Sequence, residues 1–141
     1  MQMQEVIVGL EMPARTVADY MTFAPYTICA GQSMAEAHAL MRTHKVRHLP
    51  VLRDGLLVGM VSVGDLHLLE TLPDVEPLQV TVEEAMTRDP YVVSPDTPLA
   101  EVAREMSERK LGSAVVQDRG TVVVGVFTSV DGLRALADLS G

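Results

Sequence analysis

The chain has 141 residues, the usual length of one domain, and hydrophobic residues make up 48% of it, which is enough for a core. A formal net charge of −8 disfavours binding to duplex nucleic acid, because such proteins carry a basic face. The single cysteine excludes an intrachain disulfide, and since no run resembles a signal peptide or a membrane span, we expect a cytoplasmic protein without a membrane partner.

The N-terminal part of the chain predicts short elements. The apolar run Val6–Leu10 fits either a strand or a packing arm. Thr16 fits the N-cap of a short helix over Val17–Met21. An extended segment then covers Pro25–Ile28. Cys29 lies between two apolar residues, so we interpret it as a small core residue rather than a nucleophile.

Two longer helices are predicted by capping signals and by apolar residues at helical spacing. The first helix begins after Ser33, because Ser33 and Glu36 fit a capping box. The second begins after Thr97, which fits an N-cap followed by Pro98 at the first helical position. The apolar stripes are Met34, Ala37, Leu40 and Met41 in the first helix, and Leu99, Val102, Ala103 and Met106 in the second.

A β-hairpin and a final helix are predicted after each of these helices. The paired strands are His48–Leu52 with Leu56–Val63, and Ser113–Gln117 with Thr121–Thr128. The final helices are marked by Leu66, Leu68 and Leu69 in one case, and by Leu133, Leu136 and Leu139 in the other. Two prolines in Leu72–Leu78 indicate a linker. We therefore divide the chain into repeat 1 (10–72), a linker (73–80) and repeat 2 (81–139).

These elements form an internal repeat. The run Val17–Leu66 recurs as Val82–Gly132, at an offset of 65 residues that becomes 66 after one insertion. Identical residues at matched positions include Thr22 with Thr87, Pro25 with Pro90, Tyr26 with Tyr91 and Lys45 with Lys110. A long period seen twice predicts two similar β-α-β-β-α halves about a pseudo-twofold axis, and the cleft between such halves suits a small ligand.

Each repeat ends its hairpin with a hydroxyl residue and, three positions later, an aspartate. The two pairs are Ser62 with Asp65 and Thr128 with Asp131. One interpretation is structural, since the hydroxyl caps the last helix and the aspartate completes a capping box. The other is functional, because a helix start offers N–H groups to a phosphate and the carboxylate can accept hydrogen bonds from ribose hydroxyls. The spacing leaves both interpretations open.

The order of the short motifs resembles the cystathionine-β-synthase-type (CBS) domain. The motifs in the first repeat are Val-x-x-x-Met-Thr, a capped helix with Ala-Glu, Leu49-Pro50-Val51, Asp54-Gly55, Val58-Gly59 and Ser-x-x-Asp. Because the order recurs, nearly the whole chain is similar to a CBS-domain pair. The resemblance implies an α/β fold of two βαββα repeats that binds adenosine-containing ligands, such as AMP, ADP, ATP or S-adenosylmethionine, in the cleft between repeats.

The resemblance also implies roles for residues of this chain. The aspartates at Asp65 and Asp131 hold the ribose, and the hydroxyls of Ser62 and Thr128 contact ribose or phosphate. The extended segments Thr27–Ile28 and Val92–Val93 line the base pocket. The implied site is completed by residues at the start of the middle strands: Val46, Arg47, His48 and Pro50 in repeat 1, and Leu111, Gly112, Ser113 and Ala114 in repeat 2.

The two implied sites differ in charge. Repeat 1 has Arg47 and His48 where repeat 2 has Gly112 and Ser113. A basic pair favours phosphate, because arginine binds it bidentately and keeps its charge. The alternative is that both basic residues are solvated and paired with nearby acids. We expect two unequal sites, with phosphate charge sensed mainly in repeat 1.

These observations favour a regulatory module over a catalyst. No nucleophile–base pair is visible, and the four histidines, His38, His44, His48 and His67, do not have the spacing of a metal site. We therefore expect no catalytic residue, no metal and no cofactor beyond the regulatory adenine nucleotide. The ligand would signal to a protein partner by a conformational change, and the resemblance implies a homodimer. The alternative function is a constitutive interaction and dimerisation scaffold without a ligand.

Overall fold

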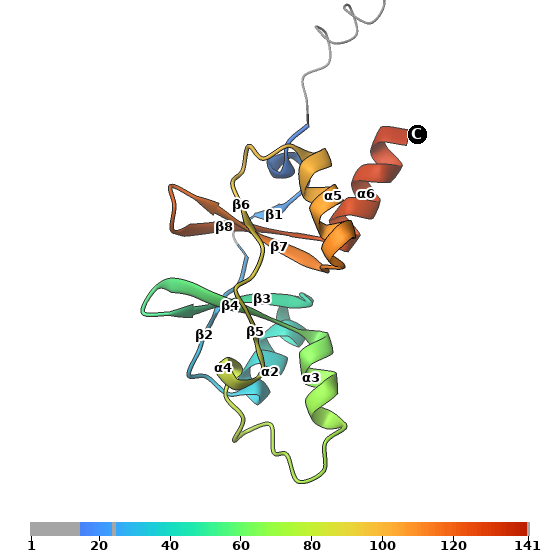
Figure 1. Cartoon of the computed structure of the whole chain (residues 1–141). Helices are drawn as coiled ribbons and strands as arrows, with labels where there is room; N and C mark the ends of the chain where they lie inside the picture. Colours follow the sequence, from blue (N-terminus) through green and yellow to red (C-terminus); the bar gives the residue numbers. More distant parts are fainter. Residues whose placement is uncertain (1–14, 24, 141) are drawn as a thin grey trace, which may run out of the picture.

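The computed structural model describes residues 15–23 and 25–140, so the apolar run Val6–Leu10 lies outside the described residues. Figure 1 shows two stacked α/β units, and the strands of the two units face each other. The elements from the first half of the chain are η1 (Val17–Asp19), β1 (Thr22–Phe23), β2 (Ile28–Cys29), α2 (Met34–His44), β3 (His48–Arg53), β4 (Leu56–Ser62) and α3 (Val63–Glu70). Those from the second half are α4 (Val82–Ala85), β5 (Thr87–Arg88), β6 (Val92–Val93), α5 (Leu99–Arg109), β7 (Ser113–Asp118), β8 (Val122–Thr128) and α6 (Ser129–Ser140).

The two sheets exchange strands between the repeats. One sheet has the order β2-β3-β4-β5 and the other has the order β1-β8-β7-β6. Strand β5 of repeat 2 therefore pairs with β4 of repeat 1, with Thr87 opposite Met60, and β1 of repeat 1 pairs with β8, with Thr22 opposite Val126. We call the structure around the first sheet unit 1 and that around the second sheet unit 2. The predicted pseudo-symmetric βαββα architecture is confirmed, but each structural unit contains residues of both repeats.

Two glycines permit this exchange. A Cβ atom on Gly59 would lie 2.8 Å from the carbonyl oxygen of Thr87, and one on Gly125 would lie 3.0 Å from that of Thr22. Each added carbon would also collide with a methionine side chain, Met86 or Met21. Only glycine therefore lets the exchanged strand approach the hairpin closely.

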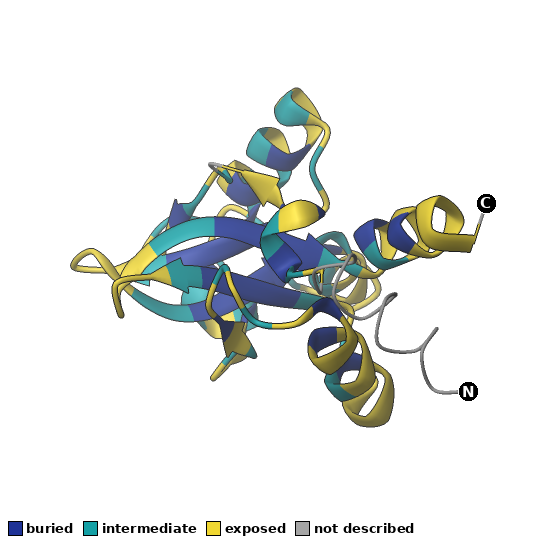
Figure 2. Cartoon of the chain, turned by 90° about the horizontal axis from the view of Figure 1, so that it is seen from above, coloured by how far each residue is buried: buried dark blue, intermediate teal, exposed yellow. Residues whose placement is uncertain are grey.

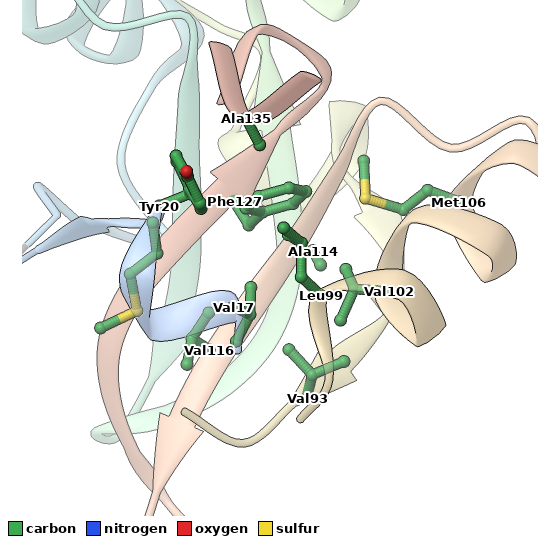
Figure 3. Packing of buried hydrophobic residues seen from close by; sticks show 11 residues of the cluster. Val17, Tyr20, Val93, Leu99, Val102, Met106, Ala114, Val116, Phe127 and Ala135 are labelled. Atoms are coloured by element: carbon green, nitrogen blue, oxygen red, sulfur yellow. The ribbon is translucent and has the colours of Figure 1, made fainter. Parts of the chain in front are cut away.

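The hydrophobic core follows the same exchange. In unit 2, Val17 and Tyr20 from the start of the chain pack with residues of α5, β7 and β8 around Phe127 (Figure 3). In unit 1, Val82 and Met86 pack with residues of α2, β3 and α3. A third cluster of buried residues joins the units and comprises Met60, Val115 and Val126. Figure 2 shows buried residues in the strands and on the helix sides that face them, with exposed residues on the outer sides.

Three local predictions need correction. The helix predicted over Val17–Met21 is a single 3₁₀ turn, because the chain enters β1 directly afterwards. The second long helix starts at Leu99 with Pro98 as its N-cap, since the Thr97 hydroxyl already accepts the Ser94 N–H at 3.0 Å. Cys29 is exposed rather than buried, because it alternates with the buried Ile28 on a two-residue edge strand.

Candidate functional site

Two clefts lie where the units meet, and each is lined by residues of both repeats. Cleft 1 is a cavity of about 390 Å³ and cleft 2 is a cavity of about 420 Å³. Cleft 1 is lined by Thr22, Phe23, Pro25, Tyr26, Lys45, Val46, Arg47, His48, Val126, Thr128, Ser129, Val130, Asp131 and Arg134. Cleft 2 is lined by His48, Met60, Ser62, Asp65, Thr87, Arg88, Asp89, Pro90, Tyr91, Arg109, Lys110, Leu111, Gly112 and Ser113. The exchanged strands β1 and β5 contribute to cleft 1 and cleft 2 respectively.

Matched residues of the two repeats occupy matched places in the clefts. Besides the aspartates Asp131 and Asp65, the residues that recur identically and line the clefts are Thr22, Pro25, Tyr26 and Lys45 in cleft 1, and Thr87, Pro90, Tyr91 and Lys110 in cleft 2. The sequence analysis identified these four pairs as repeated but assigned them no role in the site. Their identity at matched positions was the available signal, because matched positions of two repeated units lie at equivalent places in the fold.

The helix starts at the clefts are true caps. Asp65 Oδ2 accepts the Ser62 backbone N–H at 2.8 Å and the Ser62 hydroxyl at 3.1 Å, while the Asp65 N–H donates to Ser62 Oγ at 3.3 Å. Thr128 and Asp131 repeat this arrangement at 2.8, 3.2 and 3.4 Å. The capping interpretation is therefore correct. It does not exclude ligand binding, because both side chains also line a cleft and the cap hydrogen bonds use a single carboxylate oxygen.

The second carboxylate oxygen distinguishes the two clefts. Asp131 Oδ1 accepts a hydrogen bond from Arg134 Nη2 at 2.9 Å, and the same nitrogen donates to the Tyr20 carbonyl oxygen at 2.9 Å. Repeat 1 has Leu68 at the position of Arg134. Within the described residues, Asp65 Oδ1 consequently has no side-chain donor and stays available in cleft 2.

Of the described residues, His48 alone lines both clefts. Its side chain lies at the start of β3, partly buried where the two units meet. Burial lowers the pKa of His48 below its ordinary value of 6.5, and the neighbouring Arg47 lowers it further, whereas Asp65 and Asp131 act in the opposite direction. The imidazole is therefore mainly neutral at pH 7, and the permanent positive charge beside it comes from Arg47.

Both clefts are basic although the chain is acidic. Cleft 1 contains Lys45, Arg47 and Arg134 against Asp131. Cleft 2 contains a comparable set of cations, Arg88, Arg109 and Lys110, against the carboxylates Asp65 and Asp89. The sequence analysis expected little charge in the repeat 2 site, because it considered only Gly112 and Ser113. The structure brings in cations from β5 and from the end of α5, so an anionic ligand group suits either cleft.

A tyrosine in each cleft packs against a cationic or aromatic side chain of the helix that follows it in the chain. The Tyr26 and His44 rings stack with centroids 3.7 Å apart and an interplanar angle of 15°. At the matched position, the Arg109 guanidinium lies 5.4 Å from the centroid of the Tyr91 ring. Burial raises the pKa of Tyr91, with Glu105 and Glu101 contributing, so its hydroxyl stays protonated. These flat surfaces can stack against a planar group.

The structure brings together most of the residues predicted for the site. Those that line a cleft are Val46, Arg47, His48, Ser62, Asp65, Leu111, Gly112, Ser113, Thr128 and Asp131. Those that line neither cleft are Thr27, Ile28, Pro50, Val92, Val93 and Ala114. Ile28, Pro50 and Ala114 are buried in strands, and Val92 and Val93 face a separate shallow depression. The base-pocket role of the extended segments stays a prediction.

Other kinds of site find little support in the described part of the chain. There, no group of three or more His, Cys, Asp or Glu side chains could hold a metal ion. Within residues 15–23 and 25–140, no helix combines the length and apolar character needed to cross a membrane.

Comparison with known proteins identifies the family. The CBS domain matches residues 17–68 and 82–138, so this chain belongs to the CBS domain family. The CBS domain pair of protein MJ0100, solved in complex with 5′-methylthioadenosine and S-adenosyl-L-methionine, has a TM-score of 0.81 and 30% identity, covering 89% of this chain and 98% of that one. The protein CBSX2, solved in complex with AMP, has a TM-score of 0.74 and 30% identity, with coverage of 89% and 98%.

A curated relative shows where such pairs occur. L-aspartate semialdehyde sulfurtransferase of Methanocaldococcus jannaschii is 31% identical over 123 residues, which are 86% of this chain and 23% of that enzyme. This chain likewise spans only 23–32% of the next three curated relatives. The relatives therefore contain long regions with no counterpart in this chain.

Proposed function

We propose that this chain is a regulatory module that binds an adenosine-containing ligand, such as AMP, ADP, ATP or S-adenosylmethionine, in clefts 1 and 2. The observation that carries the proposal is that a capped helix start with an aspartate faces a basic cleft twice in an acidic chain. A carboxylate oxygen can accept ribose hydroxyls, the cations can bind phosphate, and the tyrosines can stack on the base. The ligands of MJ0100 and CBSX2 support this ligand class.

The mode of signalling follows from the construction of the clefts. In cleft 1, Lys45 and Arg47 belong to unit 1, whereas Thr128 and Asp131 belong to unit 2. A ligand that contacts both sides would be bound best in one relative position of the units. Binding would then shift the population toward that position and change the outer surface that a protein partner contacts.

The test is a ligand panel measured by thermal shift and calorimetry with AMP, ADP, ATP, S-adenosylmethionine and 5′-methylthioadenosine. A ligand at about 100 times its Kd should stabilise the fold by about 2.7 kcal/mol. Asp131→Asn should remove binding at cleft 1 and Asp65→Asn binding at cleft 2, whereas Asp138→Asn, on the exposed end of α6, serves as the charge control. A melting temperature that no ligand changes would favour the constitutive scaffold.

The helical face of the molecule supports self-association as a second part of the proposal. Helices α3 and α6 lie on the same side of the molecule (Figure 1). Helix α6 exposes an apolar stripe at helical spacing, and Leu68 of α3 is also exposed. The stripe comprises Val130, Leu133, Leu136 and Leu139, whose exposed fractions are between 53% and 66%. Such a surface fits a symmetric homodimer. Light scattering should show a dimer that Leu136→Glu dissociates and that Leu56→Glu, on the hairpin, leaves intact.

A further inference from the structure

A basic groove of about 350 Å³ continues from cleft 1 over the last turns of α2. Its charged or titratable lining residues are His38, Arg42, Lys45 and Arg47, and its apolar floor comprises Met41, Val46 and Val63. Lys45, Val46 and Arg47 line the groove and cleft 1 alike. The groove is therefore an extension of cleft 1 rather than a separate depression, and its described lining contains no carboxylate.

No described carboxylate forms an ion pair with a cation of the groove. Among the described residues, the ion pairs involve Arg53, Arg88, Arg109 and Arg134, and none involves a cation of the groove. The dipole of α2 accounts for Arg42 in the last turn, but not for Arg47, which lies beyond the helix. The carbonyl oxygen of Met41 at this helix end already accepts the N–H groups of Lys45 and Val46. Positive charge that has no ion-pair partner among residues 15–23 and 25–140, in a chain of net charge −8, favours an anionic binding partner.

The second repeat shows that the fold does not require these cations. The positions of His38, Arg42, Lys45 and Arg47 correspond to Ala103, Ser107, Lys110 and Gly112 in repeat 2. Helix α5 has the same length as α2, and its C-cap lysine has the same left-handed conformation. Three of the four groove residues are thus absent from a copy that folds in the same way. Their presence in repeat 1 calls for a role other than stability.

We propose that this groove binds the terminal phosphates of a nucleoside di- or triphosphate whose nucleoside lies in cleft 1. The inference rests on the proposed function and narrows its ligand class at one cleft. Arg47 and Lys45, at the junction, would contact the first phosphates, and Arg42 with His38 the outermost ones. Cleft 1 would therefore prefer ATP and ADP to AMP, whereas cleft 2, which has no counterpart of Arg42 or Arg47, would discriminate less between them.

The test measures AMP, ADP and ATP binding by calorimetry in the full chain carrying Asp65→Asn, which leaves cleft 1 as the nucleotide site. ATP should bind at least tenfold more tightly than AMP without divalent cations, and the preference should shrink at high salt. Arg42→Ser, which introduces the residue found at the matched position of repeat 2, should lower the affinity for ATP about tenfold and the affinity for AMP less than twofold. Arg104→Ser removes the same charge from the exposed face of α5 and should change neither affinity.

Two outcomes separate this inference from the proposed function. Equal affinities for AMP and ATP would contradict phosphate binding in the groove, and so would an Arg42→Ser variant that lowers both affinities equally. Either result would leave the proposal of nucleotide binding in the clefts intact. If no nucleotide binds, both proposals are wrong. Tripolyphosphate alone provides a second measurement, since it should shift the backbone amide signals of residues 42–47 in an NMR titration of the wild-type chain. Shifts confined to other residues would contradict the groove.

Discussion

Clefts 1 and 2 are two copies of one design, and they share the residues that shape a nucleoside site. Each has a threonine, a proline and a tyrosine from an exchanged strand and the segment after it, a lysine from a helix C-cap, and a hydroxyl residue that caps a helix with an aspartate. These features come from both repeats in each cleft, so they depend on the strand exchange. The residues shared by the two clefts therefore show which features of the site both copies of the fold have kept.

The clearest differences between the clefts concern charge. Cleft 1 has Arg47 where cleft 2 has Gly112, and cleft 2 has Arg88 where cleft 1 has Phe23. Arg134 of cleft 1 corresponds in sequence to Leu68, which does not line cleft 2. The positively charged side chains therefore lie at different positions around the two clefts, whereas both clefts have the same capped helix start. The comparison indicates that the residues that set the fold differ from those that set the preference for ligand charge. Substitutions that exchange residues between the two repeats can test the two sets separately.

The largest expected effect concerns the strand exchange that both clefts depend on. Gly59→Ala and Gly125→Ala should each destabilise the fold by about 1–3 kcal/mol, because the new methyl group overlaps a backbone oxygen and a methionine. Gly59→Ala should cost more, since its backbone contact is the closer one, 2.8 Å against 3.0 Å. Urea unfolding measures both. Gly31→Ala, which has no atom within 4 Å of the added carbon, is the control and should be near neutral.

The second effect separates the two aspartates. Asp131→Ala should cost about 2 kcal/mol of unfolding free energy and Asp65→Ala about 1 kcal/mol, because each removes a cap and Asp131 also loses Arg134. The Asp131 side chain is only 6% exposed, which strengthens its hydrogen bonds, although Arg134 is 54% exposed and partly screened. Urea unfolding of both variants and of Arg134→Ala provides the comparison. Equal losses for the two aspartates would show that Arg134 adds nothing.

Local sequence signals predicted the local structure of the site. The capping boxes of Ser33 with Glu36 and of Ser62 with Asp65 depend on contacts three residues apart, and the structure has both. The order of elements and the pseudo-symmetry also followed from the repeat. The exposure of Cys29 could not be predicted as easily, because a two-residue strand carries too little alternation to show which face is buried.

The features that the sequence analysis missed depend on strand pairing between the two repeats. The exchanged strands β1 and β5 are two residues long, so no periodicity marks them, and their partners lie in the other repeat. Gly59 and Gly125 were the available signal, because a glycine inside a predicted strand indicates a close backbone approach. Arg88 and Arg109 reach cleft 2 only through this exchange and the packing of α5, which explains why the motif did not include them.

The third prediction exchanges charge between the clefts. Arg47→Gly should lower ATP affinity at cleft 1 about tenfold, which corresponds to about 1.4 kcal/mol, and should hardly affect adenosine. Gly112→Arg should raise ATP affinity at cleft 2, since a Cβ atom added at Gly112 meets no atom closer than His48 Nε2 at 3.9 Å. Calorimetry in the Asp65→Asn and Asp131→Asn backgrounds assigns each effect to one cleft. An Arg47→Gly variant that weakens adenosine and ATP equally would mean that Arg47 shapes the cleft rather than senses charge.

The smallest effect concerns His48, which the two clefts share. Because burial and Arg47 lower its pKa in the folded state, the unfolded chain binds the proton more readily, and stability should fall as pH drops from the ordinary value of 6.5 through the lowered pKa. Above 6.5 both states are neutral and the contribution is complete. His48→Gln should abolish this part of the acid sensitivity, and urea unfolding of both proteins from about pH 8 to about pH 5 measures the difference.

An NMR titration of the His48 ring protons gives the midpoint of its protonation directly. AMP should raise that midpoint, because a phosphate near the imidazole favours its cation, and Asp131→Asn with Asp65→Asn should show which cleft contributes more. A midpoint at or above 6.5 in the free protein would contradict the buried environment assigned to His48.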